Sequence, residues 1–304
     1  AALALELACS GGGGGRTPPE PEAPAPAGVL TIGAVSLNPG RELEVAQPFA
    51  DYLAGRLGPV GIGQGRVVVV DSMRAMVEEL AAGRVDLYID SPFPVAFVAG
   101  HGSGLEVLLR RWKRGAESYR SLIFARADSG IETLADLRGE MFAFGEPFST
   151  TGYLLPKSAL LGAGLQLAGF QDPAADVPGD RVGYVFSNDA ESTVFWVLKG
   201  KVAAGAGNED YFIEMAGDRI DELRVIARSP SLPRSLVCAR RDLEPAVADA
   251  IVAVLLAMED DGEGRAVLEA YEGTTRFDRL PQGAERALSE VADLLPFVAE
   301  DLGE

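Results

Sequence analysis

The sequence predicts an α/β protein of about two domains, each built on a mostly parallel sheet with helices on its faces. The chain has 304 residues, a length that suits two domains of ordinary size. Short β-branched runs alternate with stretches whose apolar residues recur every three to four positions, which is the alternation of strand and helix. Residues 66–89 have the strand, helix, strand order of a βαβ unit, whose two strands are parallel.

The first third of the chain alternates strands and helices in a regular order. The strands expected there lie at residues 30–34, 66–70, 85–89 and 105–109. The helices expected between them lie at residues 45–57, 73–80 and 95–99. Ser72 is the expected N-cap of the second helix, and Gly58 and Gly83 are expected to end the first two. Pro48 falls inside the first helix, so it should lie in the first turn or kink the helix.

The remainder of the chain repeats this alternation. Further strands are expected at residues 119–126, 141–144, 181–186 and 202–205. Further helices are expected at residues 154–160, 190–198, 247–258 and 288–298. The last two helices are amphipathic, and we expect them to serve packing and not chemistry.

Three consecutive hydroxyl residues, Ser149, Thr150 and Thr151, stand between the strand at 141–144 and the helix that follows. The first backbone N–H groups of a helix have no intrahelical acceptor and point out of its end, so an oxyanion fits there beside the hydroxyls. The commonest use of Ser or Thr at this position is to cap the helix. From the residues alone, both interpretations stay open.

Residues 119–156 carry five short elements in a fixed order. They are a Tyr-x-Ser strand, a Ser-Gly-Ile turn, a Leu-x-x-Leu-x-Gly helix end, a Phe-x-Phe-Gly strand and a Ser-Thr-Thr-Gly loop. Together they resemble the phosphate, phosphite and phosphonate binding proteins of ABC transporters, and a looser likeness runs over residues 30–277. The resemblance implies a two-lobed type II periplasmic-binding fold, in which two hinge crossings join the lobes and an anion binds at the 149–152 loop.

On this resemblance we expect three parts. Residues 1–28 would be a lipoprotein signal remnant and a Gly- and Pro-rich tether. Lobe 1 would combine residues 29–122 with residues 236–304, and lobe 2 would be residues 123–235. Each lobe would hold a mixed, mostly parallel sheet flanked by helices.

The loops at the carboxyl ends of the expected strands supply the other candidate ligand contacts, because ligands gather there in open α/β sheets. In lobe 1 the candidates are Ser36, Leu37, Asp90 and Ser91. In lobe 2 they are Asn188, Asp189, Asn208 and Glu209, which join the hydroxyl residues Ser149, Thr150 and Thr151. The simpler role of an N-cap stays open for Ser91.

Asp189 stands where the resembling family usually places a histidine beside an acidic residue. A carboxylate facing the ligand would repel a fully ionised dianion, so it would favour an anion that keeps a proton or a ligand with an ammonium group, as in an aminophosphonate. Alternatively, Asp189 caps the helix at 190–198 and points away from the ligand.

Charge and composition narrow the partners. With 45 acidic and 27 basic residues the formal charge is −18, which makes nucleic acid and acidic membranes poor partners. The basic and aromatic cluster at residues 110–114 is interpreted as a solvated rim or a docking patch. Two cysteines and one histidine exclude a Cys- or His-rich metal site and a disulfide-dense scaffold, so neither a metal nor a cofactor is expected. Cys238 is expected to be a small buried hydrophobe.

Cys9 ends the apolar run Leu7-Ala8-Cys9, which is similar to the lipobox where bacterial lipoproteins are cleaved and lipidated. Glu6 interrupts that run, and the alternative is a stray cysteine in a leader. A lipid anchor would place the protein at the periplasmic or outer face of a bacterial membrane.

The function hypothesis is a lipid-anchored, monomeric solute-binding protein that captures a small phosphorus oxyanion or phosphonate by lobe closure and delivers it to ABC permease subunits. One alternative is a ligand-binding partner of a sensor kinase. Another is a cofactor-biosynthesis enzyme on the same fold. We expect no enzyme, because the chain offers only His101 as an imidazole and has no Gly-x-Ser-x-Gly elbow.

Overall fold

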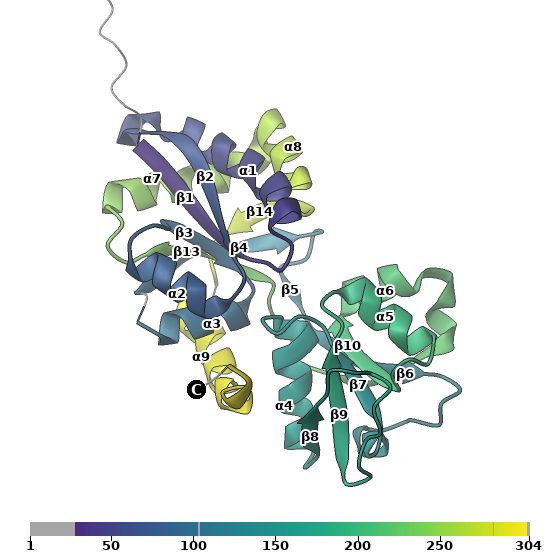
Figure 1. Cartoon of the computed structure of the whole chain (residues 1–304). Helices are drawn as coiled ribbons and strands as arrows, with labels where there is room; N and C mark the ends of the chain where they lie inside the picture. Colours follow the sequence, from purple (N-terminus) through teal and green to yellow (C-terminus); the bar gives the residue numbers. More distant parts are fainter. Residues whose placement is uncertain (1–27, 103, 282, 303–304) are drawn as a thin grey trace, which may run out of the picture.

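The computed structural model describes residues 28–302 apart from 103 and 282, and it has two lobes, each built on a six-stranded sheet (Figure 1). The first sheet has the strand order β14-β4-β13-β3-β1-β2, and β1 is parallel to both β2 and β3. Its strands are β1 (Gly28–Val35), β2 (Ile62–Val70), β3 (Leu87–Asp90), β4 (Leu105–Lys113), β13 (Ser235–Arg240) and β14 (Thr274–Asp278).

The second sheet has the order β11-β6-β10-β7-β9-β8, with parallel pairing from β10 to β8 and antiparallel pairing around β6. Its strands are β6 (Ser121–Arg126), β7 (Met141–Phe144), β8 (Gln166–Gly169), β9 (Arg181–Phe186), β10 (Ala204–Asn208) and β11 (Leu223–Arg228). Between the lobes lie β5 (Ser118–Tyr119) and β12 (Leu232–Pro233), which pair with each other as an antiparallel hinge.

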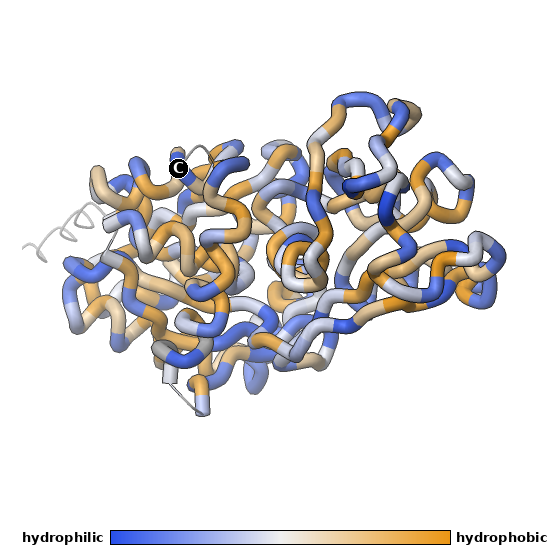
Figure 2. The backbone as a smooth tube through the Cα atoms, turned by 90° about the horizontal axis from the view of Figure 1, so that it is seen from below, coloured by the Kyte–Doolittle hydropathy of each residue, from blue (hydrophilic) through white to orange (hydrophobic). Residues whose placement is uncertain are grey.

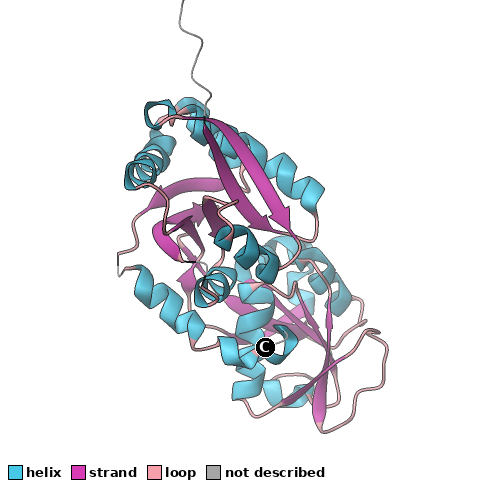
Figure 3. Cartoon of the chain, turned by 60° about the vertical axis from the view of Figure 1, so that its left-hand side comes forward, coloured by secondary structure: helices cyan, strands magenta, loops and turns pink. Residues whose placement is uncertain are grey.

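Helices cover both faces of each sheet, as Figure 3 shows. In the first lobe they are α1 (Pro39–Gly55), α7 (Pro245–Ala257) and α8 (Gly262–Ala270) on one face, and α2 (Met73–Ala81) and α3 (Pro92–Gly100) on the other. In the second lobe α5 (Ala190–Leu198) and α6 (Glu209–Ala216) lie opposite α4 (Leu155–Gly162). Figure 2 shows hydrophobic stretches running through both halves of the molecule, with hydrophilic stretches recurring at outlying turns. Within the described residues, no helix combines the length and apolarity that crossing a bilayer requires.

The predicted fold class is confirmed: the chain is an α/β protein of two lobes, each with a mixed sheet flanked by helices. The expectation of a mostly parallel sheet was wrong for the first lobe, because β4, β13 and β14 join its sheet through antiparallel pairs. Ser72 caps α2 by accepting from the amide of Ala75 at 3.3 Å, and Cys238 is completely buried, both as predicted. Pro48 lies inside α1. Strands β8, β11 and β14 were not predicted, because they lie at sheet edges and lack a long apolar run.

The C-terminal segment joins the two lobes. Helix α9 (Ala284–Ala292) packs on α3 of the first lobe, and the short turns that follow reach α4 of the second. Asp301 there accepts hydrogen bonds from Tyr153 and Lys157, and from Tyr184 at 3.0 Å. Because Lys157 is buried, this ion pair ties the end of the described chain to the second lobe.

Candidate functional site

A cavity of about 280 Å³ lies between the two lobes at the hinge. Its volume is close to about 300 Å³, the lower limit of typical small-molecule sites. We call its two sides the first-lobe wall and the second-lobe wall. The first-lobe wall carries Ser36, Glu42, Asp90, Ser91, Arg111, Lys113, Tyr271 and Glu272. The second-lobe wall carries Glu146, Ser149, Thr150, Thr151, Gly152, Asp189, Asn208 and Tyr211. Tyr119 of β5 and Arg234, which directly follows β12, come from the hinge.

The second-lobe wall is organised by the helix that begins after β7. Residues Thr150–Leu154 form one turn of π-helix that continues directly into α4. Ser149 is extended and caps it, because its Oγ accepts from the amide of Gly152 at 2.9 Å. A Cβ on Gly152 would lie 2.9 Å from that Oγ and 3.3 Å from the Cα of Gly145, so the close approach requires glycine.

Two backbone amides at this helix start have no acceptor within the described part of the chain. These are the N–H groups of Thr150 and Thr151, both of which line the cavity. The hydroxyl of Thr151 also has no hydrogen-bond partner among the described residues, while the Thr151 carbonyl accepts from Ser121 Oγ at 2.6 Å. Buried amides without partners are rare in folded proteins, and at a helix start they are oriented to receive an anion.

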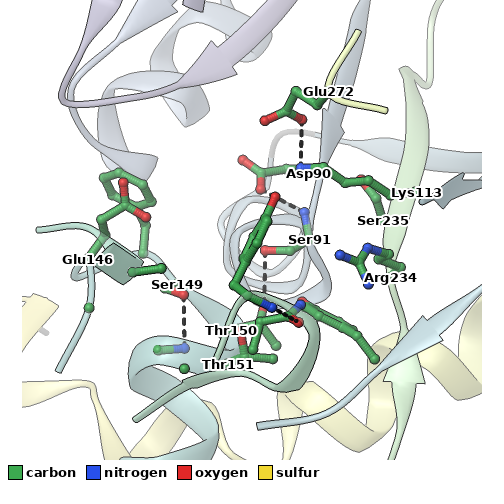
Figure 4. Close-up of a pocket in the computed structure, with 18 of the residues that line it drawn as sticks. Asp90, Ser91, Lys113, Glu146, Ser149, Thr150, Thr151, Arg234, Ser235 and Glu272 are labelled. Atoms are coloured by element: carbon green, nitrogen blue, oxygen red, sulfur yellow. Dashed lines mark hydrogen bonds and ion pairs between the residues drawn. The ribbon is translucent and has the colours of Figure 1, made fainter. Parts of the chain in front are cut away.

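The hydroxyls of Ser149 and Thr150 are both engaged within the protein, and for Ser149 the structure agrees with the capping alternative that the sequence left open. Ser149 acts as the cap. Thr150 Oγ1 accepts from the amide of Phe93 and donates to Ser91 Oγ, both at 2.9 Å, so it connects the two lobes across the cavity (Figure 4). Among these three side chains, the Thr151 hydroxyl is therefore the one left for a ligand.

The first-lobe wall contains an ion-paired cluster. Glu272 Oε2 accepts from Arg111 Nη2 at 3.0 Å and from Lys113 Nζ at 2.9 Å. Burial raises the pKa of Glu272, but the two cations outweigh it and lower that pKa to about 2. The interpretation of residues 110–114 as a rim or docking patch was wrong for Arg111 and Lys113, because β4 carries both side chains into the cavity.

Other carboxyls of the cavity have raised pKa values. Burial is the main cause for Glu42, whose pKa rises to about 7, with a further contribution from Glu272 and Asp90. The pKa of Glu146 also rises to about 7, through burial and then repulsion from Asp90 and Asp189. Desolvation also raises the pKa of Asp90 to about 6, although its carboxylate accepts from Ser91 N at 2.6 Å. These three carboxyls of the cavity therefore keep their protons to a higher pH than exposed carboxyls do.

The hinge contributes two polar atoms without partners. Tyr119 Oη and Arg234 Nε are buried and have no hydrogen-bond partner in the described structure. Arg234 Nη1 pairs with Asp210, and only 2% of the Arg234 side-chain surface is exposed. Neither residue was predicted as a site candidate. The signal available was their position, since each lies within a few residues of an expected lobe boundary, after residue 122 or after residue 235.

The remaining candidates divide into two groups. Ser36, Asp90, Ser91, Asp189 and Asn208 line the cavity, as do the three hydroxyl residues discussed above. Leu37, Asn188 and Glu209 are not part of the cavity lining, and Glu209 instead lies 3.4 Å from Arg120 and 3.6 Å from Arg228. Nowhere in the described residues do three His, Cys, Asp or Glu side chains gather as a metal site would need.

Two cavity residues of the second lobe are helix caps. Asp189 accepts from Ser192 N at 2.6 Å and from Ser192 Oγ at 2.7 Å, so both carboxylate oxygens face its own helix α5. Asn208 Oδ1 accepts from Asp210 N at 2.8 Å at the start of α6. Ser91 stands at the cap position of α3 but makes no cap hydrogen bond, and its hydroxyl accepts from Thr150 instead.

Two lobes, a paired hinge and a polar cavity between them define a periplasmic-type substrate-binding protein. The family model described as "ABC transporter, phosphonate, periplasmic substrate-binding protein" matches residues 32–282, and the chain belongs to this family. It is thus the periplasmic substrate-binding component of an ABC importer of the phosphonate and phosphate class.

Individual relatives agree with this assignment. The "Phosphate-import protein PhnD" of Mycolicibacterium smegmatis is 25% identical over 228 residues, which is 72% of this chain and 68% of the relative. XAC2383 from Xanthomonas citri, solved with a chloride ion, is 27% identical with a TM-score of 0.84, covering 90% of this chain and 99% of that one. PhnD1 from Prochlorococcus marinus, solved with methylphosphonate, shares the fold at 19% identity and a TM-score of 0.68, covering 88% and 98%.

Proposed function

We propose that the cavity binds a small phosphorus oxyanion, a phosphonate or phosphate, with its phosphoryl oxygens at the helix start of the second-lobe wall. The observation that carries this proposal is the pair of free amides at Thr150 and Thr151, with the free Thr151 hydroxyl beside them. Three donors converging at a helix N-terminus suit a tetrahedral anion. The relatives that import phosphate or were solved with methylphosphonate support the same ligand class.

A phosphonate with a cationic end is the form of ligand that the rest of the cavity favours. Glu42, Asp90 and Glu146 carry raised pKa values and lie where an ammonium group would restore their ionised forms. A ligand with an ammonium group would therefore be attracted by these carboxyls in their ionised form. A purely anionic ligand would bind well only when the same carboxyls are protonated.

Binding is proposed to close the lobes about the hinge formed by β5 and β12. The lobe boundaries expected after residues 122 and 235 shift slightly, because β6 of the second sheet begins at Ser121 and β13 of the first sheet begins at Ser235. Contacts across the cleft support this picture. Arg114 of the first lobe pairs with Glu214 of the second, and Thr150 bonds to Ser91. We propose that the protein acts as a monomer and performs no chemistry on its ligand.

Calorimetry on the purified chain tests the ligand. The panel contains phosphate, phosphite, methylphosphonate, 2-aminoethylphosphonate, ATP and sulfate, and ATP is included because XAC2383, at 26% identity, was also solved with it. We expect heat from at least one phosphorus compound and none from sulfate. Absence of binding to every phosphorus compound would refute the proposal.

A lipid anchor at Cys9 is a separate proposal, which rests on the Leu7-Ala8-Cys9 sequence because this segment lies outside the described residues. Expression in a bacterial host behind a lipoprotein leader, followed by membrane fractionation, tests it. The chain should partition to membranes and Cys9→Ala should not, whereas equal partitioning of the two would exclude lipidation at this residue.

A further inference from the structure

We infer that Arg234 is a specificity-determining residue of the anion site, whose free guanidinium edge binds the ligand's phosphoryl group in bidentate fashion from the hinge. This inference rests on the proposed function and deepens it, since it adds a full positive charge to a site otherwise built from amide and hydroxyl dipoles. In Figure 4 the side chain points into the cavity from the hinge, near Ser91 and Thr150.

The hydrogen bonds of Arg234 leave one edge of the guanidinium open. A guanidinium has two edges that match an oxyanion, one of which joins Nε and Nη2. Nη1 is bound to Asp210, Nε has no partner, and Nη2 makes no hydrogen bond within the described residues. The Nε–Nη2 edge is therefore unoccupied although the residue is only 3% exposed. A buried donor without a partner is costly, and an oxyanion is the group that satisfies this edge.

The surrounding backbone holds Arg234 in this position. Its own amide donates to the carbonyl of Glu117 at 2.9 Å, which joins the two hinge segments. Asp210 lies in the first turn of α6, where its amide donates to the Asn208 side chain at 2.8 Å. The guanidinium is thus fixed from two directions before any ligand arrives, so binding would order little additional structure.

Charge in the cavity singles out Arg234 among its lining cations. Arg111 and Lys113 both pair with Glu272, and the carboxyls of Glu42 and Asp90 line the cavity beside them, so these two cations already have acidic groups near them inside the cavity. The partner of Arg234 is Asp210, which does not line the cavity and whose side chain is 45% exposed to water. Solvent screens that carboxylate, so the positive charge of Arg234 acts mainly on the cavity side.

A comparison of Arg234→Gln with Asp210→Asn separates ligand binding from a merely structural ion pair. Both substitutions remove the same ion pair, but only the first removes the free edge. For wild type and both variants, we would measure the Kd for inorganic phosphate and methylphosphonate by calorimetry and the melting temperature of the unliganded protein. We expect Arg234→Gln to weaken binding about 100-fold, because it removes a bidentate charged contact with the ligand. We expect Asp210→Asn to weaken binding less than about 5-fold, because Asp210 holds Arg234 in place but does not contact the ligand. Equal losses in the two variants would overturn the inference.

Arg234→Lys provides a second test of the inference in case Arg234→Gln does not fold. Lysine retains the charge and the pairing with Asp210 but lacks the two-donor edge. We expect its loss of phosphate affinity to exceed that of Asp210→Asn by about 10-fold. Affinity equal to wild type would contradict bidentate binding.

Arg240→Gln is the matched control, because Arg240 ends the same strand β13 that Arg234 precedes, also pairs with an aspartate, Asp86, and does not line the cavity. It should leave the Kd unchanged, and a loss matching Arg234→Gln would show a general effect of removing charge from this strand. If the wild-type chain binds no phosphorus compound, the proposed function fails. If it binds and Arg234→Gln matches Asp210→Asn, only the present inference fails.

Discussion

The two walls of the cavity present different kinds of groups to a ligand: backbone amides without acceptors on one side and paired cations on the other. On the second-lobe wall the amides of Thr150 and Thr151 have no acceptor within the described chain and point out of a helix start. On the first-lobe wall the cations Arg111 and Lys113 already share Glu272 as their partner. One wall therefore offers donors without partners, and the other offers cations that are already paired with a carboxylate.

This difference explains how a chain of net charge −18 can hold an anion. Fixed amide dipoles act at contact distance, while the field of distant surface carboxylates is screened beyond about 8 to 10 Å at physiological salt. The paired cluster of the first-lobe wall contributes position and shape, and the anion's oxygens are left to the second-lobe wall and to Arg234 at the hinge. The predictions below test this division, from the largest expected effect to the smallest.

Thr150→Pro should weaken phosphate or methylphosphonate binding most. Proline removes the Thr150 N–H yet suits the first position of a helix, and the preceding Ser149 has the extended backbone (ψ 125°) that a residue before proline needs. Losing one charge-assisted hydrogen bond of about 1.5 to 3 kcal/mol predicts a loss of about 10- to 150-fold.

The control is Thr150→Ala, which keeps the amide but removes the hydroxyl that contacts Ser91 and Phe93. Calorimetry should place the proline variant well below the alanine variant in affinity. Equal affinities would mean that the Thr150 amide does not bind the ligand.

Thr151→Val should weaken binding by about 5- to 10-fold, since it removes one hydroxyl donor worth about 1 kcal/mol and keeps the side-chain shape. The Thr151 carbonyl would still accept from Ser121, so the melting temperature should stay near that of wild type. Replacing Thr150 as well would leave the Phe93 amide without its acceptor, so the single variant is the cleaner one. Unchanged affinity would remove the Thr151 hydroxyl from the site.

Much of the second-lobe wall was predictable from the sequence, because its information is local. A strand, three hydroxyl residues and Gly152 in succession indicate a helix start, and a helix start implies free amides wherever it occurs. The loop position of Asp90 and Ser91 after a buried strand was equally readable, since both follow an apolar run directly.

The first-lobe wall and the hinge were not predictable in this way, because their groups come together only through tertiary pairing. Glu272 lies far along the chain from Arg111 and Lys113, and it reaches them because β14 pairs with β4. Arg234 gains its role from Asp210 on another element. The use of Thr150 Oγ1 as a bridge to Ser91 likewise depends on how the lobes approach each other.

Glu146→Gln should change the pH dependence of stability. A carboxyl whose pKa is raised from 4.5 to about 7 on folding binds its proton more tightly in the folded state, so the free energy of unfolding falls as pH rises through that interval. After allowance for solvent screening of this half-buried group, the wild-type free energy of unfolding should fall by about 1 kcal/mol between pH 5 and pH 8 because of Glu146. This fall should be absent in the variant. Urea denaturation at both pH values measures it.

The same substitution should also raise affinity for methylphosphonate at pH 8 by about 3-fold, because it removes a carboxylate from the anion's side of the cavity. Glu42→Gln is the matched change on the first-lobe wall and should have a smaller effect. A larger effect at Glu42 would place the anion on the opposite wall from the one argued above.

Asp189→Asn should have the smallest effect on binding. Both carboxylate oxygens of Asp189 already accept from Ser192, one from its amide and one from its hydroxyl, so this side chain serves α5 although it borders the cavity. Asparagine is a comparable cap, so stability should change by less than about 1 kcal/mol, and affinity for methylphosphonate by less than about 2-fold. Calorimetry at pH 8 measures the affinity. A gain as large as that of Glu146→Gln would show that the Asp189 carboxylate repels the ligand and is a second repulsive carboxylate on the second-lobe wall.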